Sequence, residues 1–518
     1  MAEPARGNAN GDGNGDGNGN GAGRNGKGTG NSVLSALDGQ KSTAFLFRLT
    51  LLATLGGFLF GYDTSNIGSA LNFVPYDLKG LAEGYLVSGA SLGAAAGAIL
   101  AGPLADRYGR KILLIVDAGI YAVGSILSAV TPNAAVLLIA RTLIGLAIGA
   151  DSAIATAYIA EYAPKDRRGS LSLLQQWMIT VGILAAYLIA MLIYGVWPNS
   201  AGTVGWRLIL GLGAVPALLG LALRTSMPES PRWLLRHGKY DQARHAMGIL
   251  GVHDISDEDI RSAASTIESI EGGQSKEQRR KNWTPGVRRA LIVVCVFFIF
   301  QQITGINVPL YYGPHLLGPI FSGAHATLVK TTLAGVEVTA IMTSVNVAST
   351  YLGFRWIDKF GRRKLTIGGY TGMIVFALIA AAGLAFTSGT FRLVVIMIGL
   401  DGFIASFAVG VGGTGWTLQG EVFPTAVRGQ AAAIAAMFDW LANFLLIEIF
   451  PVSQNAISLA GVLVVFAGLC ALAIVFVWKF LPETKGLPVE DVIGLFDKAA
   501  KQGPLGGSGA APTPVTSS

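Results

Sequence analysis

Residues 161–169 read EYAPKDRRG, and residues 421–429 read EVFPTAVRG. The two stretches share the pattern Glu-x-x-Pro-x-x-x-Arg-Gly and lie about half the chain apart. Two further motifs recur at similar separations: DRYGRK (106–111) with DKFGRRK (358–364), and PES (228–230) with PET (482–484). Chance recurrence of basic loops would suit one pair but not three in the same order. The sequence therefore predicts a chain built from two similar halves.

Composition places the chain among membrane proteins. It has 518 residues, of which 52% are hydrophobic and only 13% are charged, and its mean hydropathy is +0.53. A soluble enzyme of this length would carry more charge on its surface. Both cysteines, Cys295 and Cys470, lie inside apolar runs, which argues against a disulfide framework or a thiolate metal site.

Twelve stretches are apolar enough to be transmembrane helices, which need roughly 20 residues each. They cover approximately residues 44–66, 81–104, 112–131, 134–160, 170–194, 206–226, 287–312, 328–355, 365–387, 391–419, 429–451 and 457–480. The net charge of +7 comes from Lys and Arg clustered in short loops between these stretches. That distribution is a signal of topology and does not indicate a nucleic-acid partner.

The basic loops set the expected orientation and domain order. By the positive-inside rule, both termini and the charged 227–286 segment are expected in the cytoplasm, with the protein in the plasma membrane. Residues 1–43 are a Gly/Asn/Asp-rich tail that we expect to be disordered, and they lack the pattern of a cleaved signal peptide. The expected order is tail (1–43), six-helix bundle (44–226), cytoplasmic helical linker (227–286), six-helix bundle (287–480) and cytoplasmic tail (481–518).

A parallel repeat of two six-helix halves is typical of carriers that work by alternating access, with the substrate site at midplane between the halves. The repeated loop motifs put acidic and basic residues where helices enter the cytoplasm. We expect ion pairs among them to latch that side and to break when the halves rock apart. The alternative is that these residues only fix the topology. The expected latch residues are Arg110, Glu161, Arg168, Asp358, Arg362, Arg363, Glu421 and Arg428.

Five ordered motifs carry a family resemblance: the GxxxDRxGRK stretch that begins at Gly102, PESPRWL (228–234), QQITGIN (301–307), GEVFPTAVRG (420–429) and PETKG (482–486). From Ala44 to Leu487 the chain resembles the sugar porter family of the major facilitator superfamily. The resemblance implies an all-α membrane protein with two bundles of six transmembrane helices that transports a monosaccharide. We expect no cofactor and no metal, and we expect the protein to act in the lipid bilayer as a monomer.

The stretch QQITGINVPLYY (301–312) follows an uncharged apolar run and holds the amides of a candidate sugar site. A sugar presents hydroxyls that both donate and accept hydrogen bonds, and neutral amides do the same. Gln301, Gln302 and Asn307 are therefore expected to bind substrate, and Tyr311 and Tyr312, one turn further out, are expected to close over it as an extracellular gate. The alternative is that the amides only join helices to one another.

The resemblance adds three residues to this pocket: Gln176 in the fifth span, Asn346 in the eighth and Trp416 in the tenth. Trp416 would offer a platform for the sugar ring; the alternative is a core aromatic. The family has prolines beside this tryptophan, whereas this chain reads GGTGW, so we expect the tenth span to bend at its glycines.

Asp63 stands where proton-coupled members of the family carry an aspartate and passive animal glucose carriers have an asparagine. Arg141 in the fourth span is its basic partner in the family. An ionisable residue at membrane depth is costly and therefore suggests a function, here a proton switch. A static ion pair is the alternative, and Gly213 departs from a family member that has a glutamate there. Asp117, Asp151, Glu337, Asp401 and Glu448 receive no role.

Asp439 in the eleventh span replaces an asparagine or glutamine that binds the sugar in the resembled carriers. It either accepts hydrogen bonds from a vicinal diol, or carries a second proton with the substrate, or has no substrate contact. The sequence as a whole favours a proton-coupled monosaccharide symporter. A facilitative uniporter and a non-transporting sugar sensor remain alternatives. A membrane enzyme is disfavoured because no nucleophile–base pair or metal-ligand cluster is present.

Overall fold

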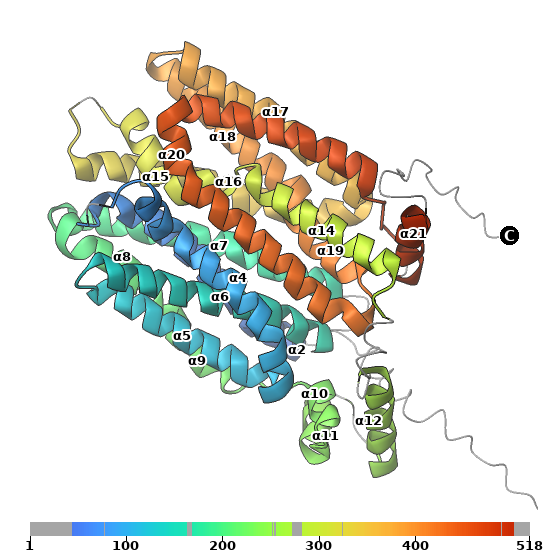
Figure 1. Ribbon diagram of the computed structural model, residues 1–518. Helices are drawn as coiled ribbons and strands as arrows, with labels where there is room; N and C mark the ends of the chain where they lie inside the picture. The colour runs from blue at the N-terminus through green and yellow to red at the C-terminus, as the bar shows by residue number, and fades with distance from the viewer. Residues whose placement is uncertain are drawn as a thin grey trace, which may run out of the picture.

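The computed structural model is helical throughout the residues that it describes, which are 44–76, 78–162, 168–250, 252, 255–271, 282–323, 325–487 and 489–501. The expected disorder of residues 1–43 lies outside these residues. Figure 1 shows two groups of long helices lying side by side, with shorter helices gathered at one end. The all-helical class predicted from the sequence is confirmed.

The first group of helices is called the N-terminal half. Its members are α2 (Ala44–Ala53), α3 (Leu55–Ala70), α4 (Leu81–Tyr108), α5 (Arg110–Val130), α6 (Ala134–Tyr162), α7 (Arg168–Val196), α8 (Trp206–Gly211) and α9 (Ala214–Arg224). Short helical turns, η1 (Leu71–Phe73), η3 (Pro198–Ser200) and η4 (Ala201–Gly205), lie in its connections.

The second group is called the C-terminal half. Its members are α14 (Pro285–Ile303), α15 (Asn307–Phe321), α16 (Leu328–Phe360), α17 (Arg362–Phe386), α18 (Gly389–Phe407), η5 (Ala408–Gly412), α19 (Gly413–Val422) and α20 (Thr425–Phe480). The η5 segment is a π-helical turn in the run AVGVG, so the tenth span is distorted up to Gly412, the first of the glycines where a bend was expected.

Length and apolarity mark ten stretches of the described residues as able to cross a membrane. One of them, Val427–Phe480, is two helices, because Ser458 has a φ of 64° in the left-handed region and kinks the chain. Another span is split at Thr54 into α2 and α3, each too short to qualify alone. With these two features taken into account, the described residues contain the twelve spans that the sequence predicted.

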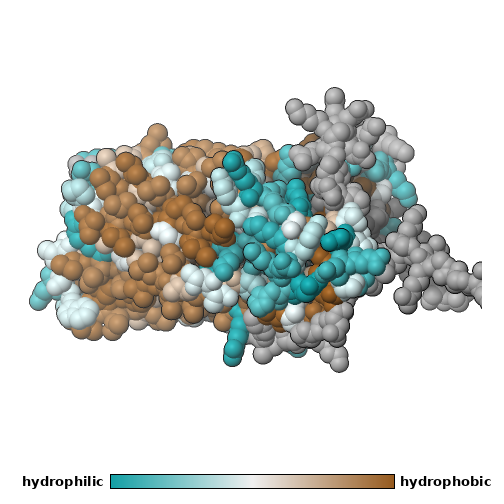
Figure 2. Space-filling model, turned by 90° about the horizontal axis from the view of Figure 1, so that it is seen from below, coloured by the Kyte–Doolittle hydropathy of each residue, from teal (hydrophilic) through white to brown (hydrophobic). Residues whose placement is uncertain are grey.

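The short helices α10 (Pro231–Arg236), α11 (Tyr240–Ile249) and α12 (Asp257–Glu271) lie together at one end of the molecule, which is called the linker end (Figure 1). Helix α21 (Val489–Lys501) lies at the same end but packs against the C-terminal half. Figure 2 shows apolar side chains covering the length of the bundle, whereas hydrophilic side chains gather toward the linker end. Large apolar side chains on the outside, such as Leu192, Phe386 and Trp478, are exposed. An apolar girdle of this kind suits contact with lipid acyl chains.

The recurring PES and PET motifs have the same structural role in both halves. In the first, the Glu229 carboxylate accepts hydrogen bonds from the backbone N–H groups of Arg110 and Lys111, at 3.0 and 3.1 Å. These groups begin α5 and have no partner within that helix. Gly109, with φ of 100°, precedes them, and a Cβ at that position would collide with the Glu229 carboxylate. A carboxylate here also complements the positive end of the α5 dipole.

The C-terminal half repeats this arrangement with different residues. Glu483 accepts hydrogen bonds from the backbone N–H groups of Arg362 and Arg363, at 2.9 and 3.1 Å. Gly361 has a φ of 86°, and a Cβ at that position would collide with the Glu483 carboxylate. In each half, a glutamate distant in sequence thus caps the N-terminus of a transmembrane helix. The recurring PES and PET motifs thus form the same helix cap in both halves.

Candidate functional site

Asp63 on α3 and Arg141 on α6 form an ion pair in the interior of the N-terminal half. The exposed fractions of the two side chains are 3% and 0%. Arg141 also donates through Nε to the carbonyl oxygen of Leu86 on α4, at 3.3 Å. The two residues named from the sequence as a proton switch are therefore brought together, and charges this deeply buried must be paired to be tolerated.

A chain of polar side chains runs through the C-terminal half. Gln302 Nε2 donates to Asp439 Oδ1 at 2.7 Å, and Asn307 Nδ2 donates both to Gln302 Oε1 at 2.8 Å and to Asn443 Oδ1 at 3.0 Å. Asn443 Nδ2 in turn donates to Ser91 Oγ on α4 of the other half, at 2.8 Å. Three of the predicted sugar-binding residues therefore form one network that reaches across the interface between the halves.

Two further predicted sugar-binding residues are Gln301 on α14 and Trp416 on α19. The Gln301 side chain donates to the Gly412 carbonyl at 3.1 Å, while its buried Oε1 has no protein hydrogen-bond partner. Trp416 is partly buried and stands edge-on to Phe298, with ring centroids 5.4 Å apart. The free acceptor on Gln301 is available to a hydroxyl donor.

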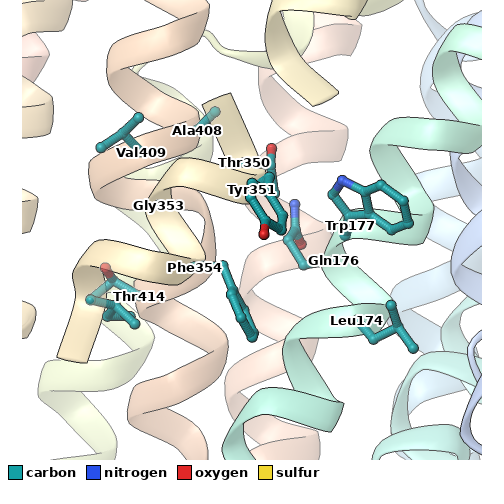
Figure 3. Close-up of a pocket in the computed structure, with 12 residues that line it drawn as sticks. Leu174, Gln176, Trp177, Thr350, Tyr351, Gly353, Phe354, Ala408, Val409 and Thr414 are labelled. Carbon is teal, nitrogen blue, oxygen red and sulfur yellow. The ribbon is translucent and has the colours of Figure 1, made fainter. Parts of the chain in front are cut away.

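A cavity of about 200 Å³ lies between α7, α16 and the η5–α19 segment (Figure 3). Gln176 points into it together with Tyr351 and Phe354, as Figure 3 shows. Thr350 lines the cavity and donates to the carbonyl of Asn346 one turn earlier, at 2.8 Å. Aromatic walls with a few polar groups are typical of small-molecule sites. Gln176 and the Asn346 region thus meet at one cavity although they come from different halves.

Away from the linker end, polar contacts join the two halves. Asn72 Nδ2 donates to Thr332 Oγ1 at 2.9 Å, and Ser88 Oγ donates to Glu448 Oε2 at 2.6 Å. The Tyr187 hydroxyl donates to the Leu310 carbonyl at 2.6 Å. These contacts close this end of the interface in the structure.

The two predicted gate tyrosines lie in this closed region. The Tyr312 hydroxyl donates to the Ile447 carbonyl at 3.1 Å, within the C-terminal half. Tyr311 is fully buried, and its backbone carbonyl is packed against Gly68 of α3 in the other half.

Five of the predicted latch residues form ion pairs, and each of these pairs lies within one half, so it does not join the halves as the expected latch would. Arg110 pairs with Asp106 and Glu161, both at 3.1 Å. Arg362 pairs with Asp358 at 2.9 Å and with Glu421 at 2.5 Å.

The other latch residues make different contacts or lie outside the described side chains. Arg428 Nε donates to the Phe423 carbonyl at 3.0 Å, and Arg363 donates to the Trp478 carbonyl. The side chain of Arg168 is not among those described.

The carboxyl group of Glu229, which caps α5, is partly shielded from solvent. Burial raises the pKa of Glu229, and the backbone N–H groups of Ser230, Lys111 and Arg110 offset part of that rise by stabilising the ionised form.

Sequence reasoning missed several polar residues that the structure brings into these networks. Asn443 lies one helical turn after Asp439, a spacing that could have identified it. Arg224, at the end of the sixth span, pairs with Asp117 and Asp151, which the sequence left without a role.

Comparison with known proteins gives a consistent result. The family model described as sugar (and other) transporter matches residues 49–496. The chain is 36% identical over 453 residues to the glucose transporter GlcP of Staphylococcus epidermidis, covering 86% of this chain and 96% of that protein. It is 34% identical over 462 residues to the arabinose-proton symporter of Bacillus subtilis, covering 88% of this chain and 96% of that protein.

Solved structures agree with the sequence relatives. A partially occluded, inward-open conformation of the xylose transporter XylE from E. coli superposes with a TM-score of 0.73 at 29% identity, covering 86% of this chain and 100% of that one.

Proposed function

The chain belongs to the sugar (and other) transporter family, and from that premise we propose that it carries a monosaccharide inward together with a proton, by alternating access. Its relatives include proteins named as sugar–proton symporters, for arabinose in Bacillus subtilis and for D-xylose in E. coli. In this proposal the protein acts as a monomer in the plasma membrane.

The buried Asp63–Arg141 pair carries the proposal. When Arg141 lies against Asp63, the carboxylate ionises at little cost, because its charge is compensated. When the arginine moves away, a carboxylate at this depth would be left without a counter-charge and would take up a proton. One proton is therefore bound and released for each separation and reunion of the pair.

The amide network supplies the sugar site in this proposal. Gln302, Asn307 and Asp439 are hydrogen-bonded to one another, so a sugar would exchange these contacts for contacts with its own hydroxyls. Gln301, Gln176, Asn346 and Trp416 extend the site toward the cavity at α7 and α16. Hexoses and pentoses differ by one hydroxymethyl group, which a pocket distinguishes by only about 1–3 kcal/mol.

The linker end is the cytoplasmic end in this proposal, with both termini on that side. The basic loops at this end support that orientation. The polar contacts at the opposite end, with Tyr311 buried beneath them, then keep the extracellular side closed. The Arg110 and Arg362 ion pairs would hold helix ends within each half, so that the halves move as rigid units.

Uptake in cells tests this function against its alternatives. Labelled glucose is offered with and without a protonophore, in competition with a panel of pentoses, hexoses and polyols. A symporter accumulates sugar above the external concentration and loses that accumulation when the protonophore is added. Equilibration that the protonophore does not change would indicate a uniporter, and binding without any uptake would indicate a sensor.

A further inference from the structure

A second buried charge cluster lies in the N-terminal half, closer to the linker end than Asp63. Arg224 at the end of α9 donates to Asp117 Oδ1 on α5 at 2.8 Å and to Asp151 Oδ1 on α6 at 2.6 Å. Only 4% of each aspartate and 1% of the arginine is exposed. Two carboxyl groups thus share a single guanidinium in a dry environment.

The second oxygen of each carboxyl group lacks a donor. Oδ2 of Asp117 and Oδ2 of Asp151 are both buried without a hydrogen-bond partner. The two carboxyl groups are neighbours, because they accept from two nitrogens of the same guanidinium. Two ionised carboxylates can only accept, so they cannot bond to each other, whereas one added proton lets one donate to the other.

The charge balance of the cluster also favours one bound proton. With both aspartates ionised, the cluster would carry one uncompensated negative charge inside the membrane. With one proton it is neutral, and both orphan oxygens gain a partner. The charged groups acting on Asp117 are Asp151 and Arg224, and those acting on Arg224 are the two aspartates. A metal cation would be repelled by the guanidinium already present, so a proton is the ligand that fits.

We propose that Asp117 and Asp151, held by Arg224, form a second proton-binding site of this carrier. This site accepts the proton released by Asp63 and passes it on toward the linker end.

The second part of the proposal rests on the proposed proton coupling. Its chemistry is the breaking of one O–H bond and the making of another. Asp63 gives up its proton as Arg141 returns to it, and the carboxyl pair takes that proton after losing its own to water at the linker end.

The helices connect the two sites directly. Asp63 and Gly56 are seven residues apart on α3, so they share a face and are separated by about 10 Å. A Cβ at Gly56 would collide with the Asp151 carboxylate, which shows that α3 packs directly on Asp151. Arg224 also donates to the carbonyl oxygens of Leu52 and Ala53, at 3.3 and 3.4 Å, where the first span is broken.

Tyr121 lies between the two sites. It is one turn after Asp117 on α5, it is buried, and its hydroxyl donates to the carbonyl of Leu59 at 2.9 Å, one turn before Asp63. A phenol that can donate and accept is a suitable intermediate between two carboxyl groups.

The bound proton is tested by infrared spectroscopy on the purified, full-length protein at neutral pH. The wild type is expected to show a protonated-carboxyl carbonyl band that is absent in Asp117→Asn, in Asp151→Asn and in the double variant alike. Either single variant leaves one carboxylate on Arg224, which then ionises. Glu258→Gln, at an exposed position on α12, is the matched control and should leave this band unchanged. Identical bands in wild type and Asp117→Asn would overturn the site.

The relay is tested by transport, using labelled glucose or whichever sugar the competition panel selects. Asp117→Asn and Asp151→Asn should lose most uphill accumulation while keeping exchange at equal concentrations, because each asparagine still accepts a hydrogen bond from Arg224. Thermal unfolding midpoints check that both variants fold. Wild-type accumulation in both folded variants would overturn the relay. If Asp63→Asn also accumulated sugar, the proposed coupling itself would fail.

Discussion

In the N-terminal half, buried aspartates are held by guanidinium groups, Asp63 by Arg141 and the Asp117–Asp151 pair by Arg224. In the C-terminal half, the buried Asp439 receives its hydrogen bond from the neutral amide of Gln302. At their linker ends, by contrast, the halves match closely, each with a glutamate-capped helix and an arginine paired to two acids.

In the proposed function, this contrast corresponds to a division of labour between the halves. The shared features lie at helix ends, where both halves must be tied in the same way to move as units. The interiors need not match, because ion pairs suit a proton and neutral amides suit the hydroxyls of a sugar. The predictions below perturb one half at a time.

The largest effect is expected from breaking the charge pair in the N-terminal half. Arg141→Ala leaves Asp63 buried without a counter-charge, and loss of one partner of a buried pair costs about 3–5 kcal/mol. Thermal unfolding in detergent should therefore show a markedly lower midpoint, and the double variant Arg141→Ala with Asp63→Asn should recover part of it. An unchanged midpoint in Arg141→Ala would mean that the pair contributes nothing to stability.

A smaller effect, on sugar binding and not on coupling, is expected in the C-terminal half. Gln302→Ala or Asn307→Ala should weaken sugar affinity by about 1–3 kcal/mol, because buried hydroxyls lose their partners. Affinity is measured by counterflow or by direct binding, and the ratio of protons to sugar should stay as in wild type. Normal affinity in both well-expressed variants would remove these amides from the site.

Asp439 tests whether the C-terminal half also handles protons. Asp439→Asn keeps a partner for Gln302, so transport should persist. The preference among sugars should shift by about 1 kcal/mol, and the apparent affinity should depend less on pH, since the amide does not titrate. Competition assays across a pH series measure both. A sugar preference and pH profile identical to wild type would exclude Asp439 from substrate binding.

The smallest effect concerns a difference between the matched helix ends. Thr484 donates to Glu421 at 2.7 Å, whereas Glu161 Oε2 has no protein partner. Thr484→Val should therefore cost about 0.5–1 kcal/mol of stability. The comparison variant Ser230→Ala removes an acceptor for the Trp233 N–H and should leave the Glu161 pairing with Arg110 unaffected. Equal stability of Thr484→Val and wild type would show that the Thr484–Glu421 hydrogen bond does not stabilise the C-terminal half.

Much of the fold was predictable because lipid imposes a simple rule, that every spanning segment is apolar and helical. The twelve spans and the two halves follow from that rule and from the recurring motifs. The break at Thr54 was not predicted, because an apolar sequence continues through it. The kink at Ser458, by contrast, lies next to the predicted gap between the eleventh and twelfth spans, at residues 452–456. Glu229 and Glu483 were recognised as a repeat, but their capping role depends on folding over more than a hundred residues.

The candidate site was predictable where a residue type is unusual for its surroundings. Gln302, Asn307, Asp63 and Arg141 stand out as polar groups in apolar spans, and the structure brings them together in pairs or networks. The partners of these residues on distant helices were harder to predict from the sequence. Asn443 contacts Ser91 only because two halves meet, and the pairing of Arg224 with two aspartates is set by helix packing that no local pattern reveals.

Proton movement driven by sugar, measured on purified protein in liposomes with a pH electrode, tests the division between the halves most directly. Glucose, arabinose and xylose are added in turn, without a pH gradient, to vesicles containing wild type or Asp63→Asn. The external medium is expected to become alkaline when a transported sugar is added to wild type. Asp63→Asn should exchange the same sugar with no change in pH. Sugar exchange by wild type without any pH change, or alkalinisation that persists in Asp63→Asn, would contradict coupling at this pair.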